Sequence, residues 1–232
     1  MTQDVNRRRF LLQTMSAAGG ALILSAPSLA DEKKEGTEAE EDVSPVEDLM
    51  REHGGLNRIL LIYEEMQRRI HAKTRPSPEP LAKSVKLIQT FIEGYHEKLE
   101  EEHLFPRLKK AGKLTDLVDT LFEQHHAGRK LTETILALST EAHFKSEKDL
   151  ETLSGALSKF IRMYRPHEAR EDTILFPAFK TVVPPKEYDL LGDQFEKREH
   201  ELFGKEGFEG IVEQIAEIEK GLGIYDLSKF TP

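Results

Sequence analysis

The feature that most constrains the fold is an internal duplication. The segment at 96–106, HEKLEEEHLFP, returns at 167–177 as HEAREDTILFP. Each copy reads His-x-x-x-Glu, then an acidic residue, and ends in Leu-Phe-Pro. A histidine precedes each copy, and the offset between these two, His53 and His125, nearly equals the offset between the copies. Because the spacing matches in both halves, the sequence predicts two similar helical hairpins, each with one His on its first helix and a His-x-x-x-Glu on its second.

Apolar periodicity places four helices around these motifs. Leu, Ile, Phe and Tyr recur at three- and four-residue intervals, which is the pattern of helices that bury one face. The expected helices span residues 45–73, 81–110, 114–141 and 147–180. The first begins at Ser44-Pro45, where Ser is the N-cap and Pro the first helical residue, and the proline-rich residues 74–80 form a connection. Mostly short connections predict antiparallel neighbours, so the expected fold is an all-α, up-down antiparallel four-helix bundle with additional C-terminal helices.

The bundle is expected to fill residues 45–182, and residues 183–232 form a C-terminal helical extension. Pro184-Pro185 closes the bundle, and residues 186–220 carry one or two helices with a break around Gly204 to Gly210. We expect this extension to pack against the bundle or a partner. A chain of 232 residues with 38% hydrophobic content is long enough for one medium domain with tails.

The N-terminus is typical of an export signal. Residues 1–30 combine Arg7-Arg8-Arg9-Phe10-Leu11, a short apolar stretch and Ser28-Leu29-Ala30 before an abrupt change to charged residues. The run Arg-Arg-x-Phe-Leu resembles a twin-arginine signal, which implies the twin-arginine export machinery as a partner and an exported, periplasmic or cell-envelope location. The alternative is an uncleaved membrane anchor, for which the apolar run is short. Residues 31–44 are an acidic linker expected to be disordered, and no membrane association is expected after cleavage.

Composition narrows the chemistry. A formal net charge of -9 argues against a nucleic-acid surface, which needs clustered Lys and Arg. The chain has no cysteine, which excludes disulfides, iron-sulfur clusters and thiolate metal sites. Any metal must therefore be bound by His and carboxylates.

The six motif residues are expected to form one buried layer. Four residues turn an α-helix only ~40° past one revolution, so His96 and Glu100 project from one face, as do His167 and Glu171. At ~1.5 Å per residue, the remaining two histidines lie at a similar depth near the same end of the bundle. Two ionised carboxylates in an apolar core are costly unless cations neutralise them. The spacing therefore predicts two divalent ions that share both carboxylates, with these ligands: His53, His96, Glu100, His125, His167 and Glu171.

These motifs, over residues 45–180, resemble the hemerythrin-like (HHE cation-binding) family. The resemblance implies two iron ions in a non-haem di-iron centre that binds oxygen or, in some members, handles nitric oxide, peroxide or iron. Oxygen-carrying hemerythrins have a further His one turn after the His of the third helix, whereas here Arg129 stands four residues after His125. The four-His, two-Glu set looks more like bacterial members associated with iron-centre repair and nitric oxide chemistry. Iron is favoured over manganese and zinc for a mixed imidazole and carboxylate site with open positions.

Several neighbouring residues have alternative interpretations. His126 competes with His125 as the ligand, and the matched half spacing favours His125. Glu101 and Asp172 lie ~100° further round their helices, as groups behind the ligands or on the surface. Four aromatic residues near the motifs are expected in the core: Tyr95, Phe105, Tyr164 and Phe176. For Tyr95, which adjoins a ligand, the alternative is a hydrogen bond from its hydroxyl to a metal-bound oxygen. The remaining histidines are expected at the bundle rim or on the surface: His71, His103, His143 and His200.

Three functions from different classes follow. The leading hypothesis is a di-iron protein that binds or reacts with a small diatomic or peroxo ligand, such as dioxygen, nitric oxide or hydrogen peroxide, with an electron-transfer partner that the sequence does not identify. The second is an iron-storing, iron-donating or sensing protein without turnover. The third is a structural bundle whose C-terminal helices recruit a partner.

Overall fold

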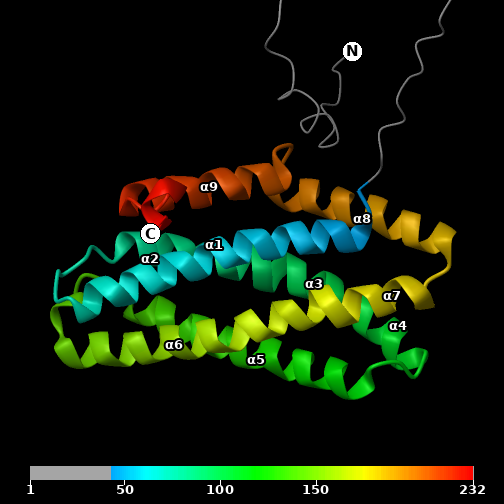
Figure 1. The fold of residues 1–232 in the computed structure, drawn as a ribbon, viewed down its shortest axis with the longest axis horizontal. Helices are drawn as coiled ribbons and strands as arrows, with labels where there is room; N and C mark the ends of the chain where they lie inside the picture. Colours follow the sequence, from blue (N-terminus) through cyan, green and yellow to red (C-terminus); the bar gives the residue numbers. More distant parts are fainter. Residues whose placement is uncertain (1–42, 232) are drawn as a thin grey trace, which may run out of the picture. The chain divides into compact units, whose positions relative to one another are not determined.

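A computed structural model describes residues 43–231 of the chain, and these residues form an up-down four-helix bundle with an added helical hairpin (Figure 1). The described residues contain helices, turns and connections but no strand, so the all-α fold class expected from the sequence is confirmed. Most of the expected signal and linker, residues 1–30 and 31–44, lies outside the described part. No helix within residues 43–231 is long and apolar enough to cross a bilayer.

The four long helices occupy the regions that the sequence predicts. The second and fourth are each continuous but contain π-helical segments, so they carry several labels. The first and third are α1 (Pro45–His71) and α5 (Thr115–Leu138). The second consists of α2 (Glu79–Leu87), η2 (Ile88–His96), α3 (Glu97–Leu99), η3 (Glu100–Leu104) and α4 (Phe105–Lys110). The fourth consists of α6 (Glu147–Arg170), η5 (Glu171–Leu175) and α7 (Phe176–Val182).

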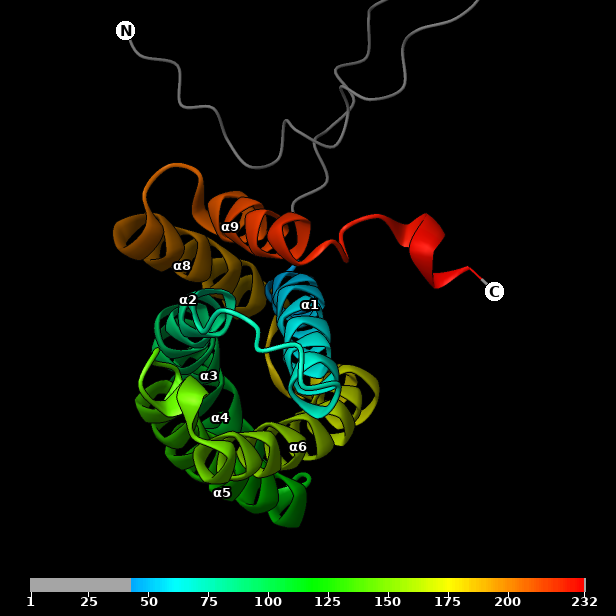
Figure 2. The same cartoon turned by 90° about the vertical axis from the view of Figure 1, so that its left-hand side faces the viewer.

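The helices pack in a ring, each against its neighbours in sequence, with α6 closing the ring against α1 (Figure 2). Between them lies one continuous apolar core that includes Leu60, Phe91, Ile135 and Phe160, each 1% exposed or less. Alternating helix direction brings the start of α1 and the end of α7 to the same end of the bundle (Figure 1). The metal-ligating motifs were expected near this end.

Helix ends follow local chemistry and correct some expected bounds. The backbone N–H of Ser44 donates to the Glu47 carboxylate at 2.9 Å, and Pro45 begins α1 as expected. Pro80 lies in the first turn of α2 rather than in the connection, because the first turn of a helix does not need its N–H groups. The third helix ends at Leu138 instead of 141, and a short 3₁₀ turn, η4 (His143–Lys145), follows it.

The second and fourth helices each widen by one residue at the motif glutamate, where regular α-helix was expected. The N–H of Phe105 donates to the carbonyl of Glu100, five residues back, and Phe176 donates to Glu171 in the same way. The proline after each Phe has no N–H to donate. Such π turns are common at functional sites and change which residues face the bundle interior.

The extension is a helical hairpin, α8 (Pro185–Phe203) and α9 (Gly207–Leu222), followed by the 3₁₀ turn η6 (Leu227–Phe230). It packs on α1 and α2, so the expectation of C-terminal helices that pack on the bundle is confirmed (Figure 2). The second helix of the hairpin starts at Gly207, directly after the break between the two helices. A glycine is needed at this position because a Cβ would lie 2.0 Å from a Glu199 oxygen. That carboxylate is buried and accepts the N–H of Phe208 at 2.8 Å.

Candidate metal centre

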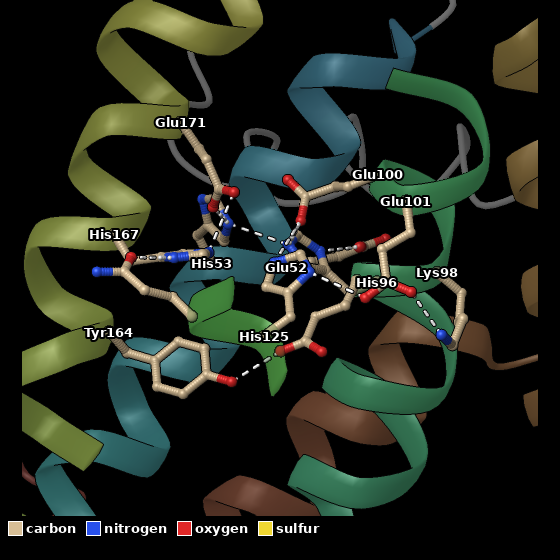
Figure 3. A network of polar contacts seen from close by, with 12 residues as sticks. Glu52, His53, His96, Lys98, Glu100, Glu101, His125, Tyr164, His167 and Glu171 are labelled. Carbon is tan, nitrogen blue, oxygen red and sulfur yellow. Dashed lines mark hydrogen bonds and ion pairs between the residues drawn. The ribbon is translucent and has the colours of Figure 1, made fainter. Parts of the chain in front are cut away.

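The six expected ligands converge in one layer between the four helices (Figure 3). Each side chain comes from the helix expected to supply it, and all six are 3% exposed or less. Their donor atoms form two groups of four that share both glutamates. One group is His53, His96, Glu100 and Glu171, and the other is His125, His167, Glu100 and Glu171.

All four imidazole rings point Nε2 into the centre. The Nε2 atoms of His53 and His167 lie 3.4 and 3.1 Å from oxygens of Glu171. Those of His96 and His125 lie 3.8 and 3.4 Å from the same Glu100 oxygen. Each carboxylate therefore contacts one histidine from each group, as a bridging carboxylate must.

The outward Nδ1 atoms are each held by an oxygen acceptor, which fixes the ring orientation. The pairs are His53 with Asp172 at 2.7 Å, His96 with Glu52 at 2.7 Å, His125 with Glu101 at 3.1 Å and His167 with Gln124 at 2.9 Å. A hydrogen bond of this kind makes Nδ1 the protonated nitrogen and leaves Nε2 free to ligate a metal. The arrangement is typical of metal-binding histidines.

Two of these four acceptors were missed by the sequence analysis. Glu101 and Asp172 were expected either behind the ligands or on the surface, and both lie behind a ligand. Glu52 and Gln124 were not singled out, although each directly precedes a motif histidine, so that the duplication relates them as it relates His53 and His125. The duplication therefore could have pointed to Glu52 and Gln124 as a matched pair. Each of them, however, bonds a histidine on another helix, and residue spacing within one helix does not reveal such a contact.

Unpaired buried atoms test whether the site fits cations. Both oxygens of Glu100, both of Glu171 and the Nε2 of His125 are buried without a hydrogen-bond partner among residues 43–231. The Nε2 atoms of His53 and His96 lie only 3.0 Å apart. Two nitrogens bound to one cation at ~2.1 Å are separated by about this distance. The donor set thus fits two cations that satisfy the otherwise unpaired atoms.

The pKa shifts of the buried His and Glu residues show which unfavourable charge interactions bound cations would remove. Burial and the neighbouring Glu171 raise the pKa of Glu100 to about 8. Burial disfavours the charged form of His125, but Glu97, Glu100 and Glu101 outweigh it and raise its pKa to about 10. For Glu171, burial is outweighed by His167 and His53, which lower the pKa well below the usual value. Cation binding requires neutral imidazoles and ionised carboxylates, so it must release protons.

A second polar group lies beside the ligands on the α5 side. The Tyr164 hydroxyl donates to Glu97 at 2.7 Å, and Arg129 bonds both Glu97 at 2.6 Å and Glu101 at 2.5 Å. Arg129, at the position of the further His in oxygen-carrying hemerythrins, thus forms ion pairs with carboxylates. Gly128 is required here, because a Cβ would lie 2.1 Å from the Tyr164 hydroxyl oxygen.

The other candidates lie away from the centre. Tyr95 is buried in the core as expected, and its hydroxyl donates to the carbonyl of Phe195 in α8 at 3.1 Å, which contradicts the alternative role toward a metal-bound oxygen. The ring of His103 packs on Phe195 as well. His126, the rival to His125, is exposed and contacts Phe122. The more distant histidines bond elsewhere or stay at the surface: His71 with Ser154, His143 with Asp149, and His200 part-buried on α8.

A four-helix bundle in which two His pairs share two buried glutamates fits the class of di-metal-binding bundle proteins. Residues 44–179 match the family described as hemerythrin HHE cation binding domain, and residues 116–205 match it a second time. This chain belongs to that family. Uncharacterized proteins of Mycobacterium tuberculosis and Mycobacterium bovis are each 46% identical to it over 231 residues, which is 97% of this chain and 91% of each relative. No solved structure gives a significant match.

Proposed function

We propose that the protein is a non-haem di-iron protein that binds or reacts with a small ligand such as dioxygen, nitric oxide or hydrogen peroxide. The observation that carries the proposal is a set of four buried carboxylate oxygens that have no hydrogen-bond partner within residues 43–231 and face four inward Nε2 atoms. A site made of imidazoles and carboxylates suits iron better than a site made of softer sulfur ligands.

The ligand assignment follows the two groups of donors. His53 and His96 would hold one ion, His125 and His167 the other, and Glu100 and Glu171 would bridge them. A pair of redox-active ions supplies Lewis acidity and electrons to a small ligand bound between or beside them. Each ion then has only two imidazoles and the shared carboxylates from the protein, which leaves coordination positions for that ligand.

The protein surrounds this site with apolar walls. Phe176 stacks on the ring of His53 and Phe105 on that of His125, with ring centroids 5.6 and 5.5 Å apart. Both Phe residues come from the duplicated Leu-Phe-Pro motif and are buried. They hold the imidazoles in place and exclude bulk water, which strengthens every electrostatic interaction in the site.

Metal analysis and spectroscopy test the proposal. The protein loaded anaerobically with two equivalents of Fe²⁺ should bind both and change its near-ultraviolet absorption on exposure to air, whereas the zinc-loaded protein should not. His125→Ala should lose part of the bound iron and the spectral change. Tight binding of two zinc ions together with failure to retain iron would contradict the proposal.

Turnover is a separate question with its own measurement. Catalytic decay of peroxide or nitric oxide beyond the amount of bound metal would support reaction with the ligand. Uptake of ligand or iron only in proportion to the metal sites would favour the alternative, an iron-storing, iron-donating or sensing protein.

Export by the twin-arginine machinery is part of the same proposal and rests on Arg7-Arg8-Arg9-Phe10-Leu11. Such a route would carry the bundle already folded with its metal, to meet an electron-transfer partner in the cell envelope. Replacing Arg7 and Arg8 by Lys should retain the protein inside the cell, which fractionation measures, while the wild type should be recovered outside with Asp31 as its N-terminal residue. Equal distribution of the two forms would contradict export by this route.

A further inference from the structure

The two cation positions are nearly identical in their ligands but differ in the residues behind those ligands. We call them the His53–His96 position and the His125–His167 position. The duplication gives each outer residue of one position a counterpart in the other, at the same place relative to the motif histidines. Comparing these pairs shows three differences in charge.

The first difference lies in the acceptor of the second-helix histidine. Glu52 holds Nδ1 of His96 at 2.7 Å, whereas its counterpart Gln124 holds Nδ1 of His167 at 2.9 Å. Glu52 is 0% exposed, so its charge is poorly screened. A carboxylate makes the imidazole it holds a stronger ligand than a neutral amide does.

The second difference concerns the acceptors Asp172 and Glu101, which hold His53 and His125. Glu101 also forms ion pairs with two positively charged side chains, Arg129 at 2.5 Å and Lys98 at 2.5 Å. Among the described residues, the only ion pair of Asp172 is that with His53. The negative charge behind His125 is therefore compensated, and that behind His53 is not.

The third difference lies one turn further along. Asn57 bonds Glu168 and is the counterpart of Arg129, which bonds Glu97. Lys98 has an alanine, Ala169, as its counterpart. At each of these equivalent positions, the residue near the His125–His167 position carries less negative or more positive charge than its counterpart near the His53–His96 position. As formal charges, the five residues behind the His125–His167 position sum to zero, and their five counterparts sum to -3. The first set is Gln124, Glu101, Glu97, Lys98 and Arg129, and the second is Glu52, Asp172, Glu168, Ala169 and Asn57.

We infer that the His53–His96 position binds its divalent cation first and more tightly, and that the His125–His167 position is the exchangeable one. The inference rests on the proposed di-metal function. Asp172 and Lys98 are about one-third exposed, so solvent weakens their contribution. The buried exchange of Glu52 for Gln124 and the part-buried Arg129 carry most of the difference.

A titration of the metal-free protein with Co²⁺, followed by calorimetry and visible absorption, tests this order. The wild type should take up two equivalents in two resolved steps. His96→Ala should abolish the tight step, and His167→Ala should abolish the weak step while leaving the tight one. Circular dichroism of each variant verifies that the bundle is intact.

Milder exchanges test the cause, because each copies the residue of the other half. Glu52→Gln should weaken the first step roughly 10- to 100-fold, the usual effect of changing a group that holds a metal ligand. Gln124→Glu should raise the affinity of the second step about tenfold and so reduce the difference in affinity between the two steps. Arg129→Asn should act in the same direction. Glu102→Gln, a matched loss of charge at an exposed residue that holds no histidine, should leave both steps unchanged.

The outcomes separate the inference from the proposed function. Two equivalents bound with equal affinity and no response to Glu52→Gln would overturn the inference and leave the di-metal proposal standing. Loss of the tight step in His167→Ala, with its retention in His96→Ala, would also overturn the order. A wild type without tight metal binding would overturn both.

Discussion

The first helical hairpin, α1 with the α2–α4 helix, and the second, α5 with the α6–α7 helix, agree in the buried cluster of His and Glu and differ one layer away from it. His53 and His125, or Glu100 and Glu171, are interchangeable in position and in the direction they point. Behind them, the two halves place different residues at equivalent positions: Leu56 and Gly128, Asn57 and Arg129, Glu93 and Tyr164. Under the proposed function, the geometry of the His and Glu residues must match because both halves would hold the same two ions, whereas the neighbouring layer needs only to pack and to pair its charges.

The largest expected effect tests what the halves share. Glu100→Ala and Glu171→Ala should each lower the affinity for both ions by more than about 100-fold, because each carboxylate serves both positions and direct ligands matter more than the groups behind them. Metal content after dialysis measures this. The metal-free Glu100→Ala variant should unfold at no lower urea concentration than the wild type, since burial raises the pKa of this carboxyl group and it has no hydrogen-bond partner among residues 43–231. Loss of only one ion in either variant would contradict bridging.

The next effect separates the Arg129 and Asn57 positions. Arg129→Ala leaves Glu97, which is 1% exposed, without its cation and should cost about 3 kcal/mol of unfolding free energy. Asn57→Ala removes a bond to Glu168, whose pKa burial raises to about 8, and should cost only about 1 kcal/mol. Urea unfolding of the metal-free proteins compares them. Equal losses would mean that the ion pair of Arg129 and the hydrogen bond of Asn57 contribute alike to stability.

A smaller effect tests the packing difference. Gly128→Ala should destabilise the protein by about 2 kcal/mol, because the new methyl group overlaps the Tyr164 hydroxyl. Gly155→Ala, in a helix with nothing within 4 Å of the added Cβ, should instead stabilise it by about 0.5–1 kcal/mol. Thermal unfolding of the two variants gives the comparison. A Gly128→Ala protein as stable as Gly155→Ala would show that Tyr164 has another place to go.

The smallest effect is a pH dependence at Glu93, the counterpart of Tyr164. Burial raises the pKa of Glu93 to about 7, with Glu97 and Glu133 adding to the shift and Thr132 and Arg129 opposing it. Between pH 4.5 and 7 the folded state therefore holds more protons than the unfolded state, so this residue makes stability fall as pH rises. Glu93→Gln should remove that loss, with a gain over wild type of about 1 kcal/mol that grows to pH 7 and is constant above it. A gain independent of pH would assign the effect to packing.

The sequence was sufficient for the fold class and for the six side chains that meet in one buried layer, because periodicity and the matched spacing act along single helices. It was insufficient where the determining contact joins two helices. Glu52 holds His96, and Tyr95 donates to Phe195 in α8, and neither pairing leaves a trace in local spacing. The widened turns at Glu100 and Glu171 were missed because both motifs read as regular amphipathic helix.

The widened turns have a further consequence for the direction in which the Glu100 and Glu171 side chains point from their helices. An extra residue in a helix can migrate along it when successive N–H groups change carbonyl partners. Pro106 and Pro177 offer no N–H, so the step that would pass the insertion toward the C-terminus is blocked in both halves. The proline that ends each Leu-Phe-Pro motif, about 1.7 turns after the glutamate, thereby limits where the widened turn can lie along the helix.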